Sequence, residues 1–113
     1  MSVFQAISQK ASEAGLPFLV IGGYAVMAHG FVRATDDLDL LVQSSRRDQW
    51  RQLLAGLGMK VYREAPAFMQ FDPPPGGRLP VDLMLVTEVV FEQMRAGAGP
   101  VSVAGVSFGV VSL

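Results

Sequence analysis

The chain has 113 residues, of which nine are basic and ten acidic, and half of its residues are hydrophobic. This length fits one domain with a real core, and the formal net charge of −1 gives no bulk electrostatic argument for nucleic-acid binding. The absence of cysteine excludes disulfides, thiolate zinc sites and cysteine nucleophiles.

The rest of the composition predicts a cytoplasmic protein without a membrane partner. The N-terminus lacks a basic-then-apolar signal pattern, and no window approaches 18 consecutive apolar residues. No repeat or linker divides the chain, so residues 1–113 are expected to form a single domain. Only 17% of the residues are charged, which predicts that one apolar face remains for a partner chain.

Hydrophobic periodicity predicts alternating helices and strands. Val3, Ile7 and Ala11 recur at helical spacing, and Gly15 followed by Pro17 ends that helix. In chain order the pattern then predicts a strand at 18–21, a short helix at 24–29, a strand at 38–42, a helix ending near 58, strand segments over 59–72, a turn at 73–77, a strand at 79–86, a helix through 95 and two β segments over 101–113. This order predicts one mixed α/β or α+β domain.

Three boundaries can be predicted in more detail. Ser44 or Ser45 can cap the helix that follows, with Asp48 in a capping-box-like position. Residues 59–72 form either one long strand or two short ones interrupted near Pro66. Thr87 is expected to cap the later helix. The residues predicted to be buried by the middle helix are Trp50, Leu53, Leu54 and Leu57.

Acids stand where a buried strand should carry apolar residues. Asp36, Asp37 and Asp39 surround the start of the strand predicted at 38–42. Side chains alternate along a strand, so Asp37 and Asp39 point to one face, and Leu38 and Leu40 to the other. Two like charges so close repel each other, and burial adds a desolvation cost. A divalent cation such as Mg²⁺ or Mn²⁺ is the natural compensator.

A third acid, Asp82, lies inside the apolar strand predicted at 79–86. If that strand lies beside residues 38–42, Asp82 completes a three-carboxylate cluster with Asp37 and Asp39. Such a cluster can hold two metal ions about 3.5–4 Å apart, one activating an attacking oxygen and one steadying the leaving group. For Asp82 alone, a solvated strand end is an equally good interpretation.

Gly22 and Gly23 follow the strand at 18–21 and open a predicted helix. In such a turn, backbone N–H groups can approach an anion closely. The sequence GGYAVMAHG has neither the G-x-G-x-x-G spacing nor the Gly-Lys-Ser/Thr of a Walker loop. Alone, a Gly-Gly pair is more often only a tight turn. Here it gains weight from the Asp-Leu-Asp that begins at Asp37.

Taken together, the stretch GGYAVMAHGFVRATDDLDLLV resembles the nucleotidyltransferases of the DNA polymerase β superfamily. It is especially similar to a small bacterial branch with abortive-infection-type toxins and lincosamide-modifying enzymes. The match covers roughly residues 16–86 and includes the stretch 33–39 and the later Val-Asp-Leu at 81–83. The resemblance implies the nucleotidyltransferase fold, with a mixed β-sheet flanked by helices on one side.

The resemblance also implies roles for individual residues. Gly22 and Gly23 would contact the phosphates of a nucleoside triphosphate such as ATP. Asp37 and Asp39 would ligate both metals. Asp82 would ligate the metal near the acceptor hydroxyl and take its proton. The reaction would be attack of that hydroxyl on the α-phosphorus, which transfers the NMP group and releases pyrophosphate.

Other polar residues near the motif allow two interpretations. We interpret Arg33 as a triphosphate contact in preference to a salt bridge with Asp36. Thr35 could bond a phosphate or, equally well, the loop backbone. His29, the single histidine, more often ends a helix than acts in catalysis. The basic stretch 46–51 is more often a solvated helix face than a nucleic-acid surface.

The chain ends soon after its last predicted strands, whereas members of the family usually continue into helices that hold base or acceptor. A homodimer or a partner subunit could supply that surface. The alternative to an enzyme is a non-catalytic nucleotide- or partner-binding module, such as a toxin–antitoxin component or a truncated remnant. The acceptor could be a small molecule, an RNA 3′ end or a protein side chain.

Overall fold

The computed structural model describes residues 3–21, 38–77, 79–97, 99–103 and 106–110. Their elements are α1 (Val3–Ala14), β1 (Leu19–Ile21), β2 (Leu38–Gln43), a 3₁₀ helix (Ser44–Arg46), α3 (Arg47–Gly56), β3 (Lys60–Ala65), β4 (Phe68–Asp72), β5 (Val81–Val86), α4 (Glu88–Ala96), β6 (Gly99–Val103) and β7 (Val106–Val110). The short helix predicted at 24–29 lies outside the described residues. No described helix has both the length and the apolar character that crossing a membrane requires.

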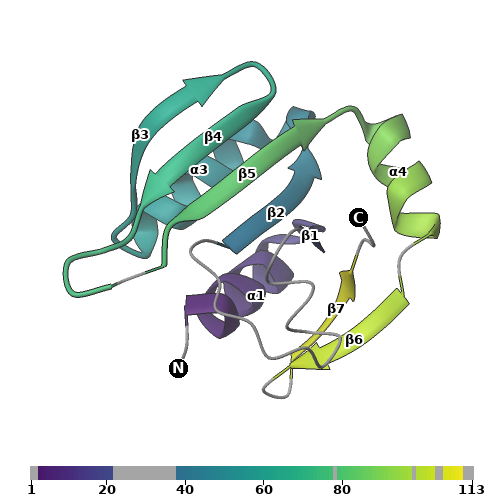
Figure 1. Ribbon diagram of the computed structural model, residues 1–113, viewed down its shortest axis with the longest axis horizontal. Helices are drawn as coiled ribbons and strands as arrows, with labels where there is room; N and C mark the ends of the chain where they lie inside the picture. The colour runs from purple at the N-terminus through teal and green to yellow at the C-terminus, as the bar shows by residue number, and fades with distance from the viewer. Residues whose placement is uncertain (1–2, 22–37, 78, 98, 104–105, 111–113) are drawn as a thin grey trace.

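Seven strands form one mixed sheet in the order β3-β4-β5-β2-β1-β7-β6 (Figure 1). β2 runs parallel to β5, and β1 runs parallel to β7. The other neighbouring strands are antiparallel. The mixed sheet expected from the sequence is therefore confirmed, and β2 lies at its centre.

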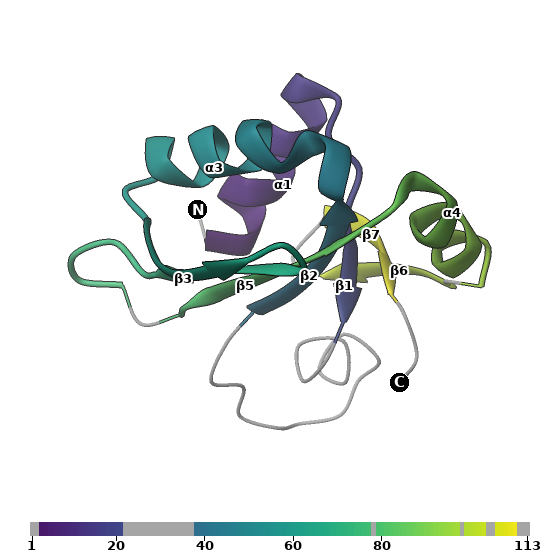
Figure 2. The same ribbon diagram turned by 90° about the horizontal axis from the view of Figure 1, so that it is seen from above.

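Helices α1 and α3 lie side by side on one face of this sheet (Figure 2). The main core fills the space between helices and strands, because each helix buries one apolar stripe and each strand buries alternate residues. Its fully buried members include Phe4, Ile7, Trp50, Leu54, Leu38, Leu40, Val42, Val81 and Leu83. Leu53 and Leu57, which were expected to be buried, are partly buried and pack against this core.

A second, smaller cluster lies on the opposite face. Leu19, Ile21 and Leu41 pack with Phe91 of α4. These strand residues alternate with members of the main core, so their side chains project to the other side of the sheet. Phe91 thus fixes α4 against the part of the second face that β1 and β2 form.

The prediction for one helix cap is confirmed and the other is wrong. The Thr87 side chain accepts a hydrogen bond from the N–H of Val90 at 3.2 Å, at the start of α4. The 3₁₀ helix after β2 delays α3 to Arg47, so neither serine reaches the capping position. Arg46 precedes α3 without a side-chain cap, and the Ser45 hydroxyl donates to Glu88 at 2.9 Å.

Residues 59–72 contain two strands, which form the hairpin β3–β4 around Pro66. The Pro73–Gly77 stretch is a turn, as expected, with φ of 83° at Gly76 and a hydrogen bond of 2.8 Å from the N–H of Gly77 to the carbonyl of Pro74. This turn returns the chain so that β5 pairs antiparallel with β4.

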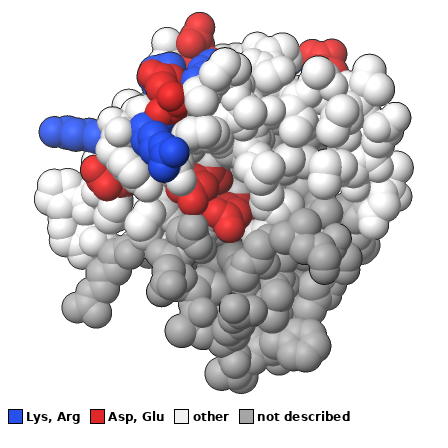
Figure 3. All heavy atoms as spheres, turned by 45° about the horizontal axis from the view of Figure 1, so that its top comes forward, with Lys and Arg blue, Asp and Glu red and all other residues white. Residues whose placement is uncertain are grey.

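The basic stretch 46–51 mainly ties α3 to β3. Arg47 and Arg51 both bond Glu64, with N–O distances of 2.9 and 2.7 Å. Hydrogen bonds from Arg51, and then from Arg47, lower the pKa of Glu64 to about 2. In Figure 3, the visible basic side chains gather on the left of the view, whereas acidic ones also lie near its centre and at its upper right. Through their bonds to Glu64, Arg47 and Arg51 stabilise the packing of α3 on the edge strand β3.

We expect Glu64→Gln to lower the free energy of unfolding at pH 7 but to have little effect near pH 2. The folded-state pKa of Glu64, about 2, lies below the value of about 4.3 for an unfolded glutamate. Its contribution is therefore present above pH 4.3 and lost as the pH falls toward 2. Urea unfolding at several pH values measures this. Glu13→Gln, which removes an exposed ion pair with Lys10, is the control. A loss of stability in Glu64→Gln that did not change with pH would contradict a stabilising role for the ion pairs of Glu64.

Candidate active site

Asp39 and Asp82 are cross-strand partners on the parallel strands β2 and β5. Neighbouring strands lie about 4.8 Å apart, and residues opposite each other share a face, so the two carboxylates project side by side. The expectation that the strand carrying Asp82 lies beside the strand carrying Asp39 is confirmed.

The pair projects away from α1 and α3. The residues that flank the two acids along their strands are buried in the main core on the helical side: Leu38, Leu40, Val81 and Leu83. Asp39 and Asp82 therefore point to the opposite face, where both are partly exposed. The predicted alternation of Asp39 with its leucine neighbours is confirmed.

The surroundings of the acids are partly apolar. Ile21 of β1 is the cross-strand partner of Asp39 on its other side, and it belongs to the second cluster. The Oδ1 atom of Asp82 is buried from solvent. Two adjacent carboxylates beside apolar side chains are costly to keep charged without a cation nearby. Their oxygens are also hard ligands, so the pair fits Mg²⁺ or Mn²⁺.

The alignment of the acids is set where the two strands begin. The N–H of Leu38 donates to the carbonyl of Pro80 at 2.9 Å, directly before β5 starts. From there the ladder pairs each residue of β2 with its counterpart in β5, and Asp39 meets Asp82. A slip of one residue would turn one acid toward the main core, so burial on the helical side holds the register.

The other predicted site residues lie in the stretch 22–37, outside the described residues: Gly22, Gly23, Arg33, Thr35 and Asp37. His29 and Asp36 lie there as well. Within the described residues no three acidic, histidine or cysteine side chains form a metal-binding group. Asp37 immediately precedes Leu38, the first residue of β2, so the third predicted ligand adjoins the pair in sequence.

Sequence reasoning did not identify Gln70. This residue of β4 is the cross-strand partner of Asp82 and is partly buried on the same face. Its neighbours Met69 and Phe71 are buried in the main core, so alternation along β4 was the available signal. The register of β4 against β5 was unknown from sequence, and only that register brings an amide beside the acid pair.

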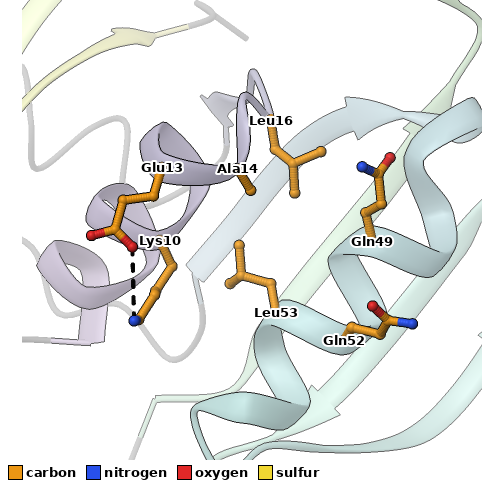
Figure 4. A pocket seen from close by; sticks show the side chains of 7 residues that line it. All are labelled: Lys10, Glu13, Ala14, Leu16, Gln49, Gln52 and Leu53. Carbon is orange, nitrogen blue, oxygen red and sulfur yellow. Dashed lines mark ion pairs between the residues drawn. The ribbon is translucent and has the colours of Figure 1, made fainter.

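A separate hollow of about 450 Å³ lies between α1 and α3 (Figure 4). Lys10 and Glu13 form an ion pair of 3.8 Å at its edge, and Gln49, Gln52 and Leu53 line the α3 side. It lies on the helical side of the sheet, away from the acid pair. Its lining combines one surface ion pair with amides and apolar groups, and we assign no chemistry to it.

No protein-family model and no curated protein matches the sequence. Solved structures match the fold. The crystal structure of ANT(2″)-Ia in complex with adenylyl-2″-tobramycin gives a TM-score of 0.75 at 22% identity, over 97% of this chain and 67% of that chain. A solution structure of ANT(2″)-Ia gives 0.66 at 26% identity, over 74% and 45%. The lincosamide antibiotic adenylyltransferase LnuA, bound to lincomycin, gives 0.76 at 12% identity, over 96% and 78%.

At these identities the likeness concerns the arrangement of helices and strands. It extends along nearly the whole of this chain, including the strands that carry Asp39 and Asp82. The chain spans about two thirds of ANT(2″)-Ia in one structure and less than half in the other. The resemblance indicated by the motifs is confirmed at the level of the fold.

Proposed function

We propose, from the premise that this chain has the nucleotidyltransferase fold of the DNA polymerase β-like superfamily, that it transfers an NMP group from a nucleoside triphosphate to an acceptor hydroxyl. The observation that carries the proposal is the pairing of Asp39 with Asp82 on adjacent parallel strands at the centre of the sheet. Two structures of similar fold support it, one bound to an adenylylated antibiotic and one an adenylyltransferase.

The acids would divide the work between metal binding and proton transfer. Asp37, Asp39 and Asp82 would hold Mg²⁺ or Mn²⁺, which when bound neutralises triphosphate charge and makes a hydroxyl more acidic. Asp82 stands on the side of the pair that faces β4. A carboxylate oxygen of Asp82 would accept the proton of the acceptor hydroxyl.

The nucleotide would approach from the β1 side. Ile21, the last residue of β1, pairs with Asp39, and Gly22 follows it directly in the chain. The backbone N–H groups of Gly22 and Gly23 would therefore begin next to the acid that meets the phosphates. Arg33 and Thr35 are proposed to contact the triphosphate as well.

In the proposed transfer, the acceptor hydroxyl, the triphosphate and Asp82 account for every bond and proton that changes. The acceptor oxygen forms a bond to the α-phosphorus while the bond from that phosphorus to the bridging oxygen breaks. Pyrophosphate leaves with the bridging oxygen, and the hydroxyl proton passes to Asp82. The contribution of the chain is positioning and charge neutralisation, as in other phosphoryl transfers.

Calorimetric titration of each common nucleoside triphosphate, with Mg²⁺ and with a chelator, tests the proposal. We expect binding that requires the metal, and we expect Gly23→Val to abolish it because a side chain would separate the phosphate from the backbone. Gly97→Val is the matched control. A Cβ at Gly97 meets only the Met94 carbonyl, at 3.8 Å. Folded wild-type protein that bound no nucleotide would instead favour a non-catalytic partner-binding module.

A further inference from the structure

The face of the sheet that carries the acid pair continues across β4 and β3. No described helix packs there, since α1 and α3 lie on the other side and α4 packs over β1 and β2 (Figure 2). The register carries two rows of side chains outward from β5. One row runs from Asp82 to Gln70 and then to Arg63, and the next joins Met84 to Phe68.

We call Arg63, Phe68, Gln70 and Met84 the β3–β5 strip. Met84 is 48% exposed although it lies inside the sheet, between the buried core residues Leu83 and Leu85 of its own strand. The Arg63 guanidinium lies 5.4 Å from the centre of the Phe68 ring. The strip therefore offers an apolar surface at Met84, a planar cation stacked on an aromatic ring, and an amide next to Asp82.

We propose that this strip binds the acceptor, and that the acceptor is a small hydroxyl compound with an apolar ring face that is neutral or anionic. The inference rests on the proposed function. The strip adjoins the side of the acid pair occupied by Asp82, which receives the hydroxyl proton. Gln70 would hydrogen-bond the hydroxyl-bearing part, and Met84 would contact the ring.

The size of the strip limits what it can hold. Arg63 lies two strands from Asp82, which corresponds to about 10 Å across the sheet. An aryl glycoside has roughly this reach. Its sugar hydroxyl would lie at Asp82 while its far end approached Arg63.

The charges of the strip argue against a polyamine. Arg63 is its single charged residue, and it is a cation. In the next row Lys60 and Asp72, of opposite charge, are cross-strand partners. Glu64 projects to the helical side, where it bonds two arginines. Asp39 and Asp82 are assigned to the metal, so among the described residues of β3, β4 and β5 the one further carboxylate on this face is that of Asp72, and a lysine is its cross-strand partner.

The test uses the full chain labelled with ¹³C on its methionine methyls, in the presence of Mg²⁺ and ATP. The chain has six methionines, and Met84→Leu identifies the Met84 signal. The probes are 4-nitrophenyl glucoside, which is neutral, 4-carboxyphenyl glucoside, which carries a carboxylate at its aryl end, and tobramycin, which is a polyamine. We expect both aryl glucosides to shift the Met84 methyl saturably below about 10 mM, and tobramycin to leave it unchanged.

Variants separate the parts of the strip. Arg63→Gln should weaken the carboxyphenyl glucoside by about fivefold and leave the nitrophenyl glucoside unchanged, because only the aryl carboxylate gains from the guanidinium. Met84→Lys removes the reporter methyl, so its binding is followed by calorimetry, and it should abolish binding of both. Val89→Lys, which introduces the same charge at an exposed apolar residue of α4, should leave both intact.

The proposal is overturned if tobramycin shifts Met84 at concentrations as low as the aryl glycosides do, or if neither glycoside shifts it. Tighter competition by a short RNA would overturn the small-molecule assignment. Calorimetry with ATP on the same samples separates this proposal from the proposed function. ATP binding with a silent Met84 rejects the strip alone. A Met84 response without ATP binding keeps the strip as a ligand site and rejects its role in nucleotide transfer.

Discussion

Asp39→Asn is expected to abolish metal-dependent nucleotide binding and to lower nucleotide transfer by more than about 100-fold, since even the outer partners of metal ligands typically contribute 10–100-fold. The substitution keeps the size and shape of the side chain and removes its charge. Asp39 pairs in register with Asp82 and adjoins Ile21, so no other described residue of β2 can take its position. The effect should therefore fall on the metal and on the phosphates it neutralises.

Transfer can be measured with α-labelled nucleoside triphosphates, and binding by calorimetry. Fluorescence of Trp50, the single tryptophan, reports folding because that side chain is fully buried. Asp72→Asn is the matched control, since Asp72 is an exposed acid on β4, two strands from β2. Wild-type transfer by folded Asp39→Asn, or an equal loss in Asp72→Asn, would reject the assignment of the acid pair.

Trp50→Ala is expected to lower the free energy of unfolding by about 3–5 kcal/mol, the usual cost of removing a large aromatic side chain from a core. The indole meets the Phe18 ring edge-on at 6.1 Å, and Phe18 meets Phe4 in the same way at 6.2 Å. These contacts join α3, α1 and the segment before β1. A domain with about 5–15 kcal/mol of stability would lose much of its margin.

Urea unfolding followed by circular dichroism measures this loss, because the substitution removes the fluorescent residue. Trp50→Phe should cost less than half as much. It keeps a ring, and it removes an indole N–H that is buried without a hydrogen-bond partner among the described residues. Tyr62→Ala, at a 54% exposed position, should change stability by less than about 0.5 kcal/mol. A similarly small loss for Trp50→Ala would show that the aromatic contacts are not structural.

Local sequence patterns predicted the features that depend only on residues close together in the chain. Alternation put Asp39 on the face opposite its leucine neighbours, and a threonine directly before an expected helix predicted the Thr87 cap. The serine cap failed because a 3₁₀ helix intervened after β2. A single turn of this kind changes which residue precedes the α-helix, although the composition of the segment fits either arrangement.

Contacts between distant segments could not be predicted in the same way. Glu64 meets Arg47 and Arg51 because β3 returns beneath α3. The sequence of the basic stretch alone does not predict that Glu64 is the partner of these arginines. Gln70 reaches Asp82 only through the antiparallel register of β4 and β5. The sequence predicted that Asp39 and Asp82 lie together only if their two strands are neighbours. The sheet order shows that β2 and β5 are neighbours.

The position of β1 between β2 and β7 has a consequence for how the chain folds during synthesis. Leu19 pairs with Gly109 across this junction, so one side of β1 gains its hydrogen-bonding partner only when β7 has been made. Until then β1 is an edge strand with unpaired N–H and C=O groups, which can pair with another chain. Pairing over such a sequence separation also slows folding. The nascent protein thus depends on residues 106–110 leaving the ribosome before its sheet is complete.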